Sequence, residues 1–193
     1  MSIKKAGTDI RMQKVAGCFN GHINDKTNVL DLGAGNGYIS HYLQNRFGCK
    51  IHCADIMNYL EYDLPFIKIV DNKLAFDNNF FDVAIIIDTL HHMEEKIQVL
   101  MLLEAVRVAK KVIIFETERT FVALLLDKIM SKIQSMYMPV PWTHKTRAGW
   151  QKLFKDLNIE FEEVQIKRNG LYPMEHLCFI VNKPISHIEA LVI

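Results

Sequence analysis

Short apolar runs alternate with amphipathic segments through the first two thirds of the chain. We predict five strands from these runs, at 29–32, 50–55, 65–70, 81–88 and 111–116. The segments 38–47 and 94–108 instead repeat apolar residues at helical spacing, and Gly48 is placed to end the first of these helices. Strands that alternate with helices in this way predict a doubly wound, parallel α/β sheet.

The two ends of the chain have a different texture. A weak helical stripe near the N-terminus is formed by Ile10, Met12, Val15, Ala16 and Phe19. We expect a Leu- and Met-rich helix at 121–138, and Thr146 is positioned to cap a further helix. Two extended segments, 160–167 and 175–182, could close the sheet as a hairpin-like edge.

Composition narrows the class of protein. With 193 residues, half of them hydrophobic, one domain with a sizeable core is expected. The 23 Lys and Arg nearly balance the 22 Asp and Glu, which disfavours nucleic acid as a partner. The 4 cysteines are scattered without a C-x-x-C pair, so free thiols are expected and no metal site is predicted. The sequence shows neither a signal peptide nor an apolar run of about 18 residues, so no membrane span is predicted and a cytoplasmic protein is expected.

A glycine-rich turn follows the first predicted strand. Gly33, Gly35 and Gly37 lie between this strand and a helix, an arrangement that lets backbone approach a ligand at a helix N-terminus. A dinucleotide fingerprint would place its third glycine where Tyr38 stands. Asp31, just before the turn, would repel a pyrophosphate and attract a cation. A nucleoside with a positive appendage, such as S-adenosylmethionine, therefore suits the turn better than NAD or a nucleotide sugar, which are the rival ligands.

Four carboxylates end predicted strands: Asp31, Asp55, Asp71 and Asp88. Ligands of open parallel sheets bind outside the carboxyl ends of the strands, so these side chains are candidates for a common site. Asp55 lies 20 residues beyond Gly35, the separation at which an acidic residue reaches ribose hydroxyls. The alternative for each carboxylate is a solvated acid at a strand end.

Four segments, in order, resemble motifs of the class I S-adenosylmethionine-dependent methyltransferases of the type 11 kind. They are 29–37, Asp55, 71–82 and the segment 87–93 with its paired histidines. The resemblance covers residues 25–120 and implies a Rossmann-like, seven-stranded sheet with helices on both faces and an antiparallel last strand. It implies a single methyltransferase domain over 1–193, in which 1–25 form an N-terminal helix or lid, 26–118 bind the cofactor and 119–183 shape the acceptor side.

The same resemblance assigns cofactor contacts. The turn that would lie against the methionine and ribose consists of Gly33, Ala34, Gly35, Asn36 and Gly37. Asp31 would meet the ammonium of the cofactor, directly or through water. Asp55 would bind the ribose hydroxyls, and Ile56 would pack on the adenine. Asp71 would accept from the adenine amine, and Asn72 would offer its backbone N–H.

The acceptor side is less well defined. Asp88 and Leu90 would line the methionine end of the cofactor and the mouth of the acceptor site. His91 and His92 are candidate bases for an acceptor that loses a proton, with structural packing or helix capping as the alternative. Further candidates that would touch the acceptor are His144, Tyr172 and His176. Residues 121–138 are a candidate lid, with ordinary core or a dimer face as the alternatives.

These features predict methyl transfer from S-adenosylmethionine to a small-molecule or lipid-like acceptor. Catalysis would depend on aligning the acceptor with the methyl group near His91 and His92. Two other interpretations stay open at this point. The chain could be a non-catalytic protein that binds S-adenosylmethionine and serves as a partner of another protein, or an enzyme that uses NAD or a nucleotide sugar. A homodimer is also compatible with the sequence.

Overall fold

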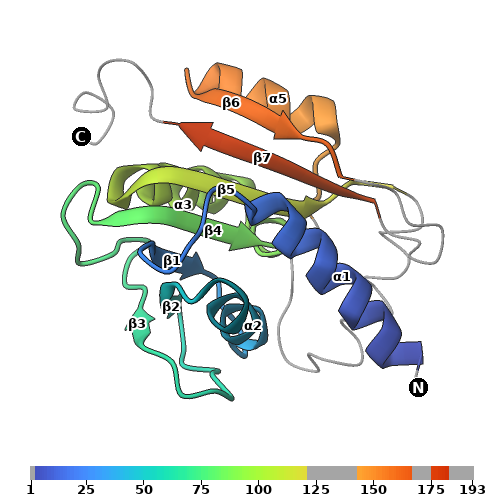
Figure 1. Cartoon of the computed structure of the whole chain (residues 1–193). Helices are drawn as coiled ribbons and strands as arrows, with labels where there is room; N and C mark the ends of the chain where they lie inside the picture. The colour runs from blue at the N-terminus through green and yellow to red at the C-terminus, as the bar shows by residue number, and fades with distance from the viewer. Residues whose placement is uncertain (1–2, 121–142, 167–174, 183–193) are drawn as a thin grey trace.

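The computed structural model describes residues 3–120, 143–166 and 175–182. Its centre is a seven-stranded sheet with the order β3-β2-β1-β4-β5-β7-β6 (Figure 1). The strands are β1 Asn28–Leu32, β2 Lys50–Asp55, β3 Phe66–Lys68, β4 Phe81–Ile87, β5 Ala109–Thr117, β6 Glu160–Val164 and β7 His176–Asn182. The described helices are α1 Ile3–Phe19, α2 Tyr38–Phe47, α3 Glu95–Val108, α5 Arg147–Asp156 and the short 3-10 helix η1 Leu90–His92.

Strand β1 is the point at which the winding of the sheet reverses. It pairs in parallel with β2 on one side and with β4 on the other, and β3 and β5 extend the two halves in parallel. The carboxyl ends of β1, β2 and β4 therefore share one edge of the sheet, next to the reversal. Strand β7 runs antiparallel to both β5 and β6, which confirms the predicted seven-stranded sheet with an antiparallel last strand.

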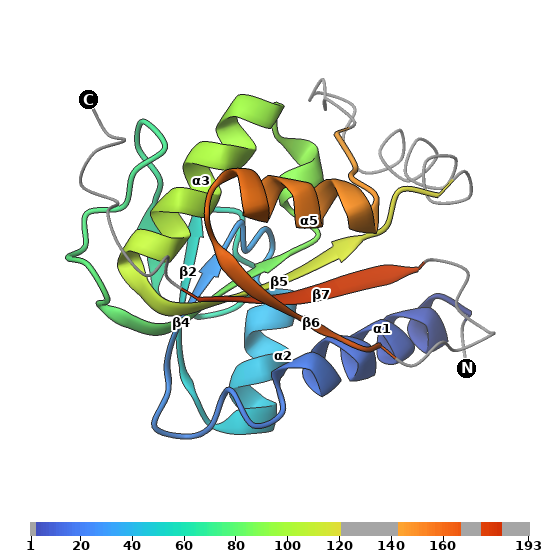
Figure 2. The same cartoon turned by 90° about the horizontal axis from the view of Figure 1, so that it is seen from above.

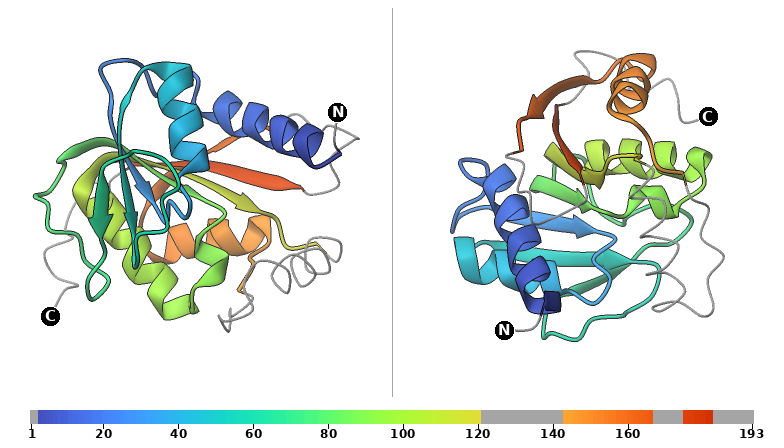
Figure 3. Two further views of the ribbon diagram at one scale, coloured as in Figure 1. Left: turned by 90° about the horizontal axis from the view of Figure 1, so that it is seen from below. Right: turned by 90° about the vertical axis from the view of Figure 1, so that its right-hand side faces the viewer.

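Helices cover both faces of the sheet, as predicted (Figure 2). Alternate side chains of β4 explain the two layers, because successive residues of a strand point to opposite faces. Val83, Ile85 and Ile87 belong to the apolar cluster with α1 and α2. Ala84 and Ile86 belong to the other cluster, with α3 and α5. Figure 3 shows α1 and α2 on one side of the sheet and α3 and α5 on the other.

Helix α1 occupies the predicted N-terminal helical stretch and packs on the sheet. Met12, Val15 and Phe19 recur at helical spacing and are buried. The helix ends where the carbonyl of Phe19 accepts hydrogen bonds from the next turn of chain, which contains Gly21 at φ 80. Glycine tolerates this left-handed conformation, so the chain can leave the helix and enter β1.

The third strand is shorter than predicted. Pairing with β2 spans 66–68, and the chain then bends into a tight turn closed by a bridge between Val70 and Lys73. Asp71 and Asn72 form the tip of this turn at φ 50 and 58, which removes them from the strand. Outside the described residues lie the predicted helix at 121–138, the end of the extended segment 160–167, and Tyr172.

Candidate functional site

The glycine turn after β1 leaves backbone exposed at one point and packs tightly at others. Gly33, Gly35 and Gly37 all have positive φ, at 82, 55 and 76. A Cβ on Gly33 would lie 2.1 Å from the side chain of Thr89, so this glycine allows the turn to touch the segment after β4. A Cβ on Gly35 would meet nothing within 4 Å. The backbone at Gly35 therefore faces open space, where a ligand could approach.

The rest of the turn is held by backbone hydrogen bonds. Both Gly33 and Ala34 donate their N–H to the carbonyl of Ala54 on β2, at 2.8 and 3.2 Å. Asn36 accepts from the N–H of Glu61 through its carbonyl, at 3.0 Å. These bonds order the turn before any ligand binds, which lowers the entropy cost of binding.

Asp55 links the end of β2 to the turn. One carboxylate oxygen accepts from the N–H of Gly35 at 3.0 Å, and the other from the N–H of Ile56 at 2.7 Å. A carboxylate oxygen has a second lone pair, so each can still accept from a hydroxyl. The Ile56 side chain is 53% exposed, which offers an apolar surface beside this carboxylate. Asp71 and Asn72 lie at the tip of the turn that follows the adjacent strand β3.

Asp31 is placed differently from the other strand-end carboxylates. It is buried in the interface between β1 and α2, where Ser40 donates a hydrogen bond to it at 2.5 Å. Burial raises the pKa of Asp31 to about 7, and the charge of Asp55 acts in the same direction, against the hydrogen bond from Ser40. The carboxyl group of Asp31 therefore stands behind the turn, inside the fold.

Asp88, immediately after β4, joins helix α1 to the sheet. Its carboxylate accepts from Arg11 of α1 at 2.7 Å and from the hydroxyl of Thr117 at 2.9 Å, and His176 lies 3.7 Å away. Burial would raise the pKa of Asp88, but Arg11 and His176 hold this pKa well below its usual value. The side chain is therefore a carboxylate at neutral pH, at the edge of the sheet that the turn also occupies.

Glu116, near the end of β5, organises the segment after β4. The carboxylate is buried and accepts from the backbone N–H groups of Thr89 and Leu90, at 2.9 and 2.7 Å. Its other oxygen lies 2.6 Å from Nδ1 of His91. Three groups of one short segment are therefore held by one side chain, which fixes the position of the His91 ring.

Three of the predicted histidines are buried near this carboxylate. The rings of His91 and His144 stack at 4.2 Å between centroids, and the ring of His92 lies 4.1 Å from that of His91. His176 stacks on Phe115 at 4.6 Å, beside Asp88. The structure thus brings all four described histidines of the prediction to the carboxyl ends of β4 and β5, with His92 exposed.

Asp88, His91 and Glu116 could together bind a metal ion, because their ligand atoms all lie within 4.8 Å of one another. Among the described residues, this is the one such group of histidine, cysteine and acidic side chains. The guanidinium of Arg11 already neutralises one of these carboxylates. The arrangement is suited to accept or hold a proton on a histidine, since two carboxylates stabilise an imidazolium.

Sequence reasoning missed three side chains of this site: Ser40, Arg11 and Glu116. Glu116 carried a signal, because it follows four apolar residues of a buried strand, a position that demands a partner for a carboxylate. No sequence pattern indicated Ser40 or Arg11, since their contacts with Asp31 and Asp88 form only when the chain folds.

Comparisons with known proteins agree with this geometry. Residues 30–114 match the model of a family described as a methyltransferase domain. No curated protein matches the sequence. A methyltransferase of Aquifex aeolicus that depends on S-adenosylmethionine is 22% identical, with 88% of this chain and 87% of that chain covered and a TM-score of 0.60.

Two further solved structures share the fold. Magnesium protoporphyrin IX methyltransferase from Synechocystis PCC 6803, with bound S-adenosylhomocysteine, is 15% identical over 92% of this chain and 84% of its own, with a TM-score of 0.64. A methyltransferase in complex with the Trm112 methyltransferase activator of Haloferax volcanii is 16% identical over 95% and 93%, with a TM-score of 0.69.

The chain thus has the fold of the S-adenosylmethionine-dependent methyltransferases, and its residues 30–114 match the methyltransferase-domain model. The fold expected from the sequence is thus confirmed, and the match to the methyltransferase-domain model supports the expected activity and cofactor. Among the helices that the structure describes, none is long and apolar enough to cross a membrane.

Proposed function

We propose that this protein is an S-adenosylmethionine-dependent methyltransferase that acts on a small-molecule acceptor, held beside His91 at the carboxyl ends of β4 and β5. The observation that carries the proposal is the buried contact between His91 and Glu116, on the segment that Gly33 touches through Thr89. The cofactor turn and the histidine cluster are therefore neighbours. A base at this position would take the proton that a hydroxyl or amine acceptor loses on methylation.

On the cofactor side, we assign the ribose to Asp55 and the adenine to Ile56, Asp71 and Asn72. The two remaining lone pairs of the Asp55 carboxylate match the two hydroxyls of a ribose. The methionine end would lie along the turn 33–37, over the open backbone at Gly35. Asp31 would act on the cofactor ammonium from behind the turn, through water or through its field, because its carboxyl is buried against Ser40.

On the acceptor side, Glu116 determines which nitrogen of His91 is basic. A neutral imidazole that donates from Nδ1 to Glu116 carries its lone pair on Nε2. Nε2 would accept the acceptor's proton as the methyl group moves from the sulfonium to the acceptor, leaving S-adenosylhomocysteine. Asp88 and Leu90 would bound the space between the two ligands, with Leu90 held through its N–H by Glu116.

Calorimetry tests the cofactor half of the proposal. S-adenosylmethionine and S-adenosylhomocysteine should bind with similar affinity, and NAD should not bind. Binding of NAD alone, or of neither nucleoside, would overturn it.

Transfer of a labelled methyl group to a set of small hydroxyl and amine compounds tests the acceptor half. Replacing His91 by Asn should lower the rate about 100-fold or more while S-adenosylhomocysteine still binds. His41→Asn, on α2 outside the histidine cluster, is the control and should keep its rate. An unchanged rate in His91→Asn, with the variant folded by circular dichroism, would remove His91 from the site.

A further inference from the structure

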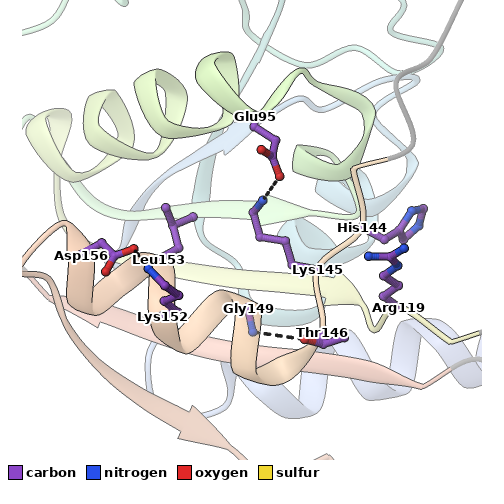
Figure 4. A pocket seen from close by; sticks show the side chains of 9 residues that line it. All are labelled: Glu95, Arg119, His144, Lys145, Thr146, Gly149, Lys152, Leu153 and Asp156. Atoms are coloured by element: carbon purple, nitrogen blue, oxygen red, sulfur yellow. Dashed lines mark hydrogen bonds and ion pairs between the residues drawn. The ribbon is translucent and has the colours of Figure 1, made fainter.

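A cavity of about 410 Å³ lies beside the histidine cluster, between the segment after β5, the start of α3 and α5. Figure 4 shows the side chains that line it. They are Glu95, Arg119, His144, Lys145, Thr146, Gly149, Lys152, Leu153 and Asp156. The volume suits a small molecule, and most of the lining side chains are polar or charged, with both signs of charge present.

The cavity is connected to the histidine cluster through His144, which belongs to both. The ring of His144 lines the cavity and stacks on His91. The neighbouring residue Thr143 donates its N–H to the carbonyl of His91 at 3.2 Å, and its side chain accepts from Gln98 at 2.5 Å. A ligand in this cavity would therefore contact His144, whose ring stacks on that of His91, on a wall that hydrogen bonds hold in place.

Most of the charge around the cavity is already neutralised. Lys145 lies 3.0 Å from Glu95, and Lys152 lies 2.5 Å from Asp156. Arg119 differs, because none of the described carboxylates lies within ion-pair distance of its exposed guanidinium.

The backbone N–H groups at the start of α5 are already occupied, so they do not form a site for an anion by themselves. The N–H of Gly149 donates to the Thr146 hydroxyl at 3.2 Å, and the N–H of Arg147 donates to Glu118 at 3.3 Å. Among the lysine and arginine side chains that line the cavity, Arg119 is thus the one that no described carboxylate neutralises. Its backbone N–H donates to the carbonyl of Lys145 at 3.2 Å, which keeps the residue beside the cavity wall.

We infer that the methyl acceptor carries a carboxylate or phosphate group, which binds in this cavity to Arg119. The inference rests on the proposed function and adds the chemical class of the acceptor. A guanidinium presents paired N–H donors that match the oxygens of either anion. A lipid tail does not suit the cavity, because it would bury the charged guanidinium of Arg119 without a counter-ion. The anion at Arg119 would direct the rest of the acceptor along His144 toward His91.

Titration of the full chain with inorganic phosphate and with acetate tests the inference. Amide NMR spectra would be recorded with and without S-adenosylhomocysteine, while chloride keeps the ionic strength constant. The signals of Thr146 and Gly149 should shift with a saturable, millimolar dependence. Saturation by phosphate alone would identify a phosphate group on the acceptor, and saturation by acetate alone a carboxylate; either supports the inference.

Two variants distinguish specific binding at Arg119 from attraction of anions by the net positive charge around the cavity. Arg119→Gln should weaken anion binding about tenfold or more, since a charge-assisted hydrogen bond is lost. Lys152→Gln, at the same cavity but paired with Asp156, should change the affinity less than about twofold. Both should bind S-adenosylhomocysteine like the parent protein.

The inference is overturned if neither anion gives saturable shifts, or if Arg119→Gln binds them as the parent does. Such a result with S-adenosylhomocysteine still bound leaves the proposed function standing. Failure of the nucleoside to bind contradicts the proposed function itself, whatever the anions do.

Discussion

Nδ1 of His91 lies 2.6 Å from the carboxylate of Glu116, although 25 residues of chain separate the two. The contact is buried, and the same carboxylate also accepts the N–H groups of Thr89 and Leu90. A buried carboxylate is costly without partners, so these three contacts explain why Glu116 is tolerated in the core. They also make the segment after β4 depend on a residue of β5.

Glu116→Ala should lower the free energy of unfolding by about 2 kcal/mol or more, because it leaves the buried N–H of Leu90 and the partly buried N–H of Thr89 without an acceptor. Glu116→Gln should cost less, since its amide oxygen can still accept from Thr89 and Leu90. Urea denaturation measures both. Glu160→Ala, at an exposed position on β6, should stay within about 0.5 kcal/mol. A Glu116→Ala protein as stable as this control would contradict the structural role.

Asp55→Ala should weaken binding of S-adenosylhomocysteine by about 1–3 kcal/mol, through loss of the proposed ribose acceptor and of its bond to Gly35. Calorimetry measures the change. Asp63→Ala removes an exposed carboxylate from the loop that follows β2 and should leave affinity unaltered. Equal affinities for the two variants would exclude Asp55 from the cofactor site.

Gly33 should matter mainly for the stability of the fold, and Gly35 mainly for cofactor binding. Gly33→Ala should destabilise the fold by about 2 kcal/mol or more, because its Cβ would meet Thr89 at 2.1 Å and its φ is 82. Gly35→Ala meets no neighbour, so it should cost only about 1–2 kcal/mol of backbone strain. Its methyl group would nevertheless occupy the proposed cofactor space and weaken S-adenosylhomocysteine binding.

Thermal unfolding and calorimetry together distinguish these two effects. Gly17→Ala in α1 has no neighbour within 4 Å and no positive φ, and should stabilise the protein by about 0.5–1 kcal/mol. If Gly35→Ala bound S-adenosylhomocysteine as tightly as Gly17→Ala, the cofactor would not lie over this turn.

The sequence predicted those parts of the fold and site that local patterns encode. Apolar runs predicted the strands, and the alternate glycines with Asp55 predicted the turn and the carboxylate that its backbone contacts. Contacts between distant segments left no such pattern. The ion pair of Arg11 with Asp88 joins residues 77 apart, and no periodicity in the sequence indicates it.

The sequence did not indicate the direction of the Asp31 side chain. A strand-end carboxylate beside a glycine turn suggested an interaction with the cofactor ammonium, directly or through water. In the structure this side chain points to the α2 face of β1, where Ser40 donates a hydrogen bond to it. Which face a strand residue takes depends on the register of the sheet and on the helix that covers it.

This burial predicts how stability varies with pH. The pKa of Asp31 is raised to about 7 in the folded protein, whereas an unfolded aspartate titrates near pH 4. Between these values the folded state binds more protons than the unfolded state, so the contribution of Asp31 to stability falls as pH rises and levels off above about pH 7. The contribution of Asp31 to the free energy of unfolding would change by up to about 1.4 kcal/mol per pH unit.

Asp31→Asn should remove this contribution, so the variant should gain stability relative to the parent as pH rises from 5 to 7. Ser40→Ala removes the hydrogen bond that lowers the pKa of Asp31, so its decline should continue to higher pH. Urea denaturation from pH 5 to 8.5 measures all three proteins, and their differences cancel the other titrating groups. Parallel profiles for the parent and Asp31→Asn would show that Asp31 is ionised throughout, and that a cation or water inside the fold stabilises its charge.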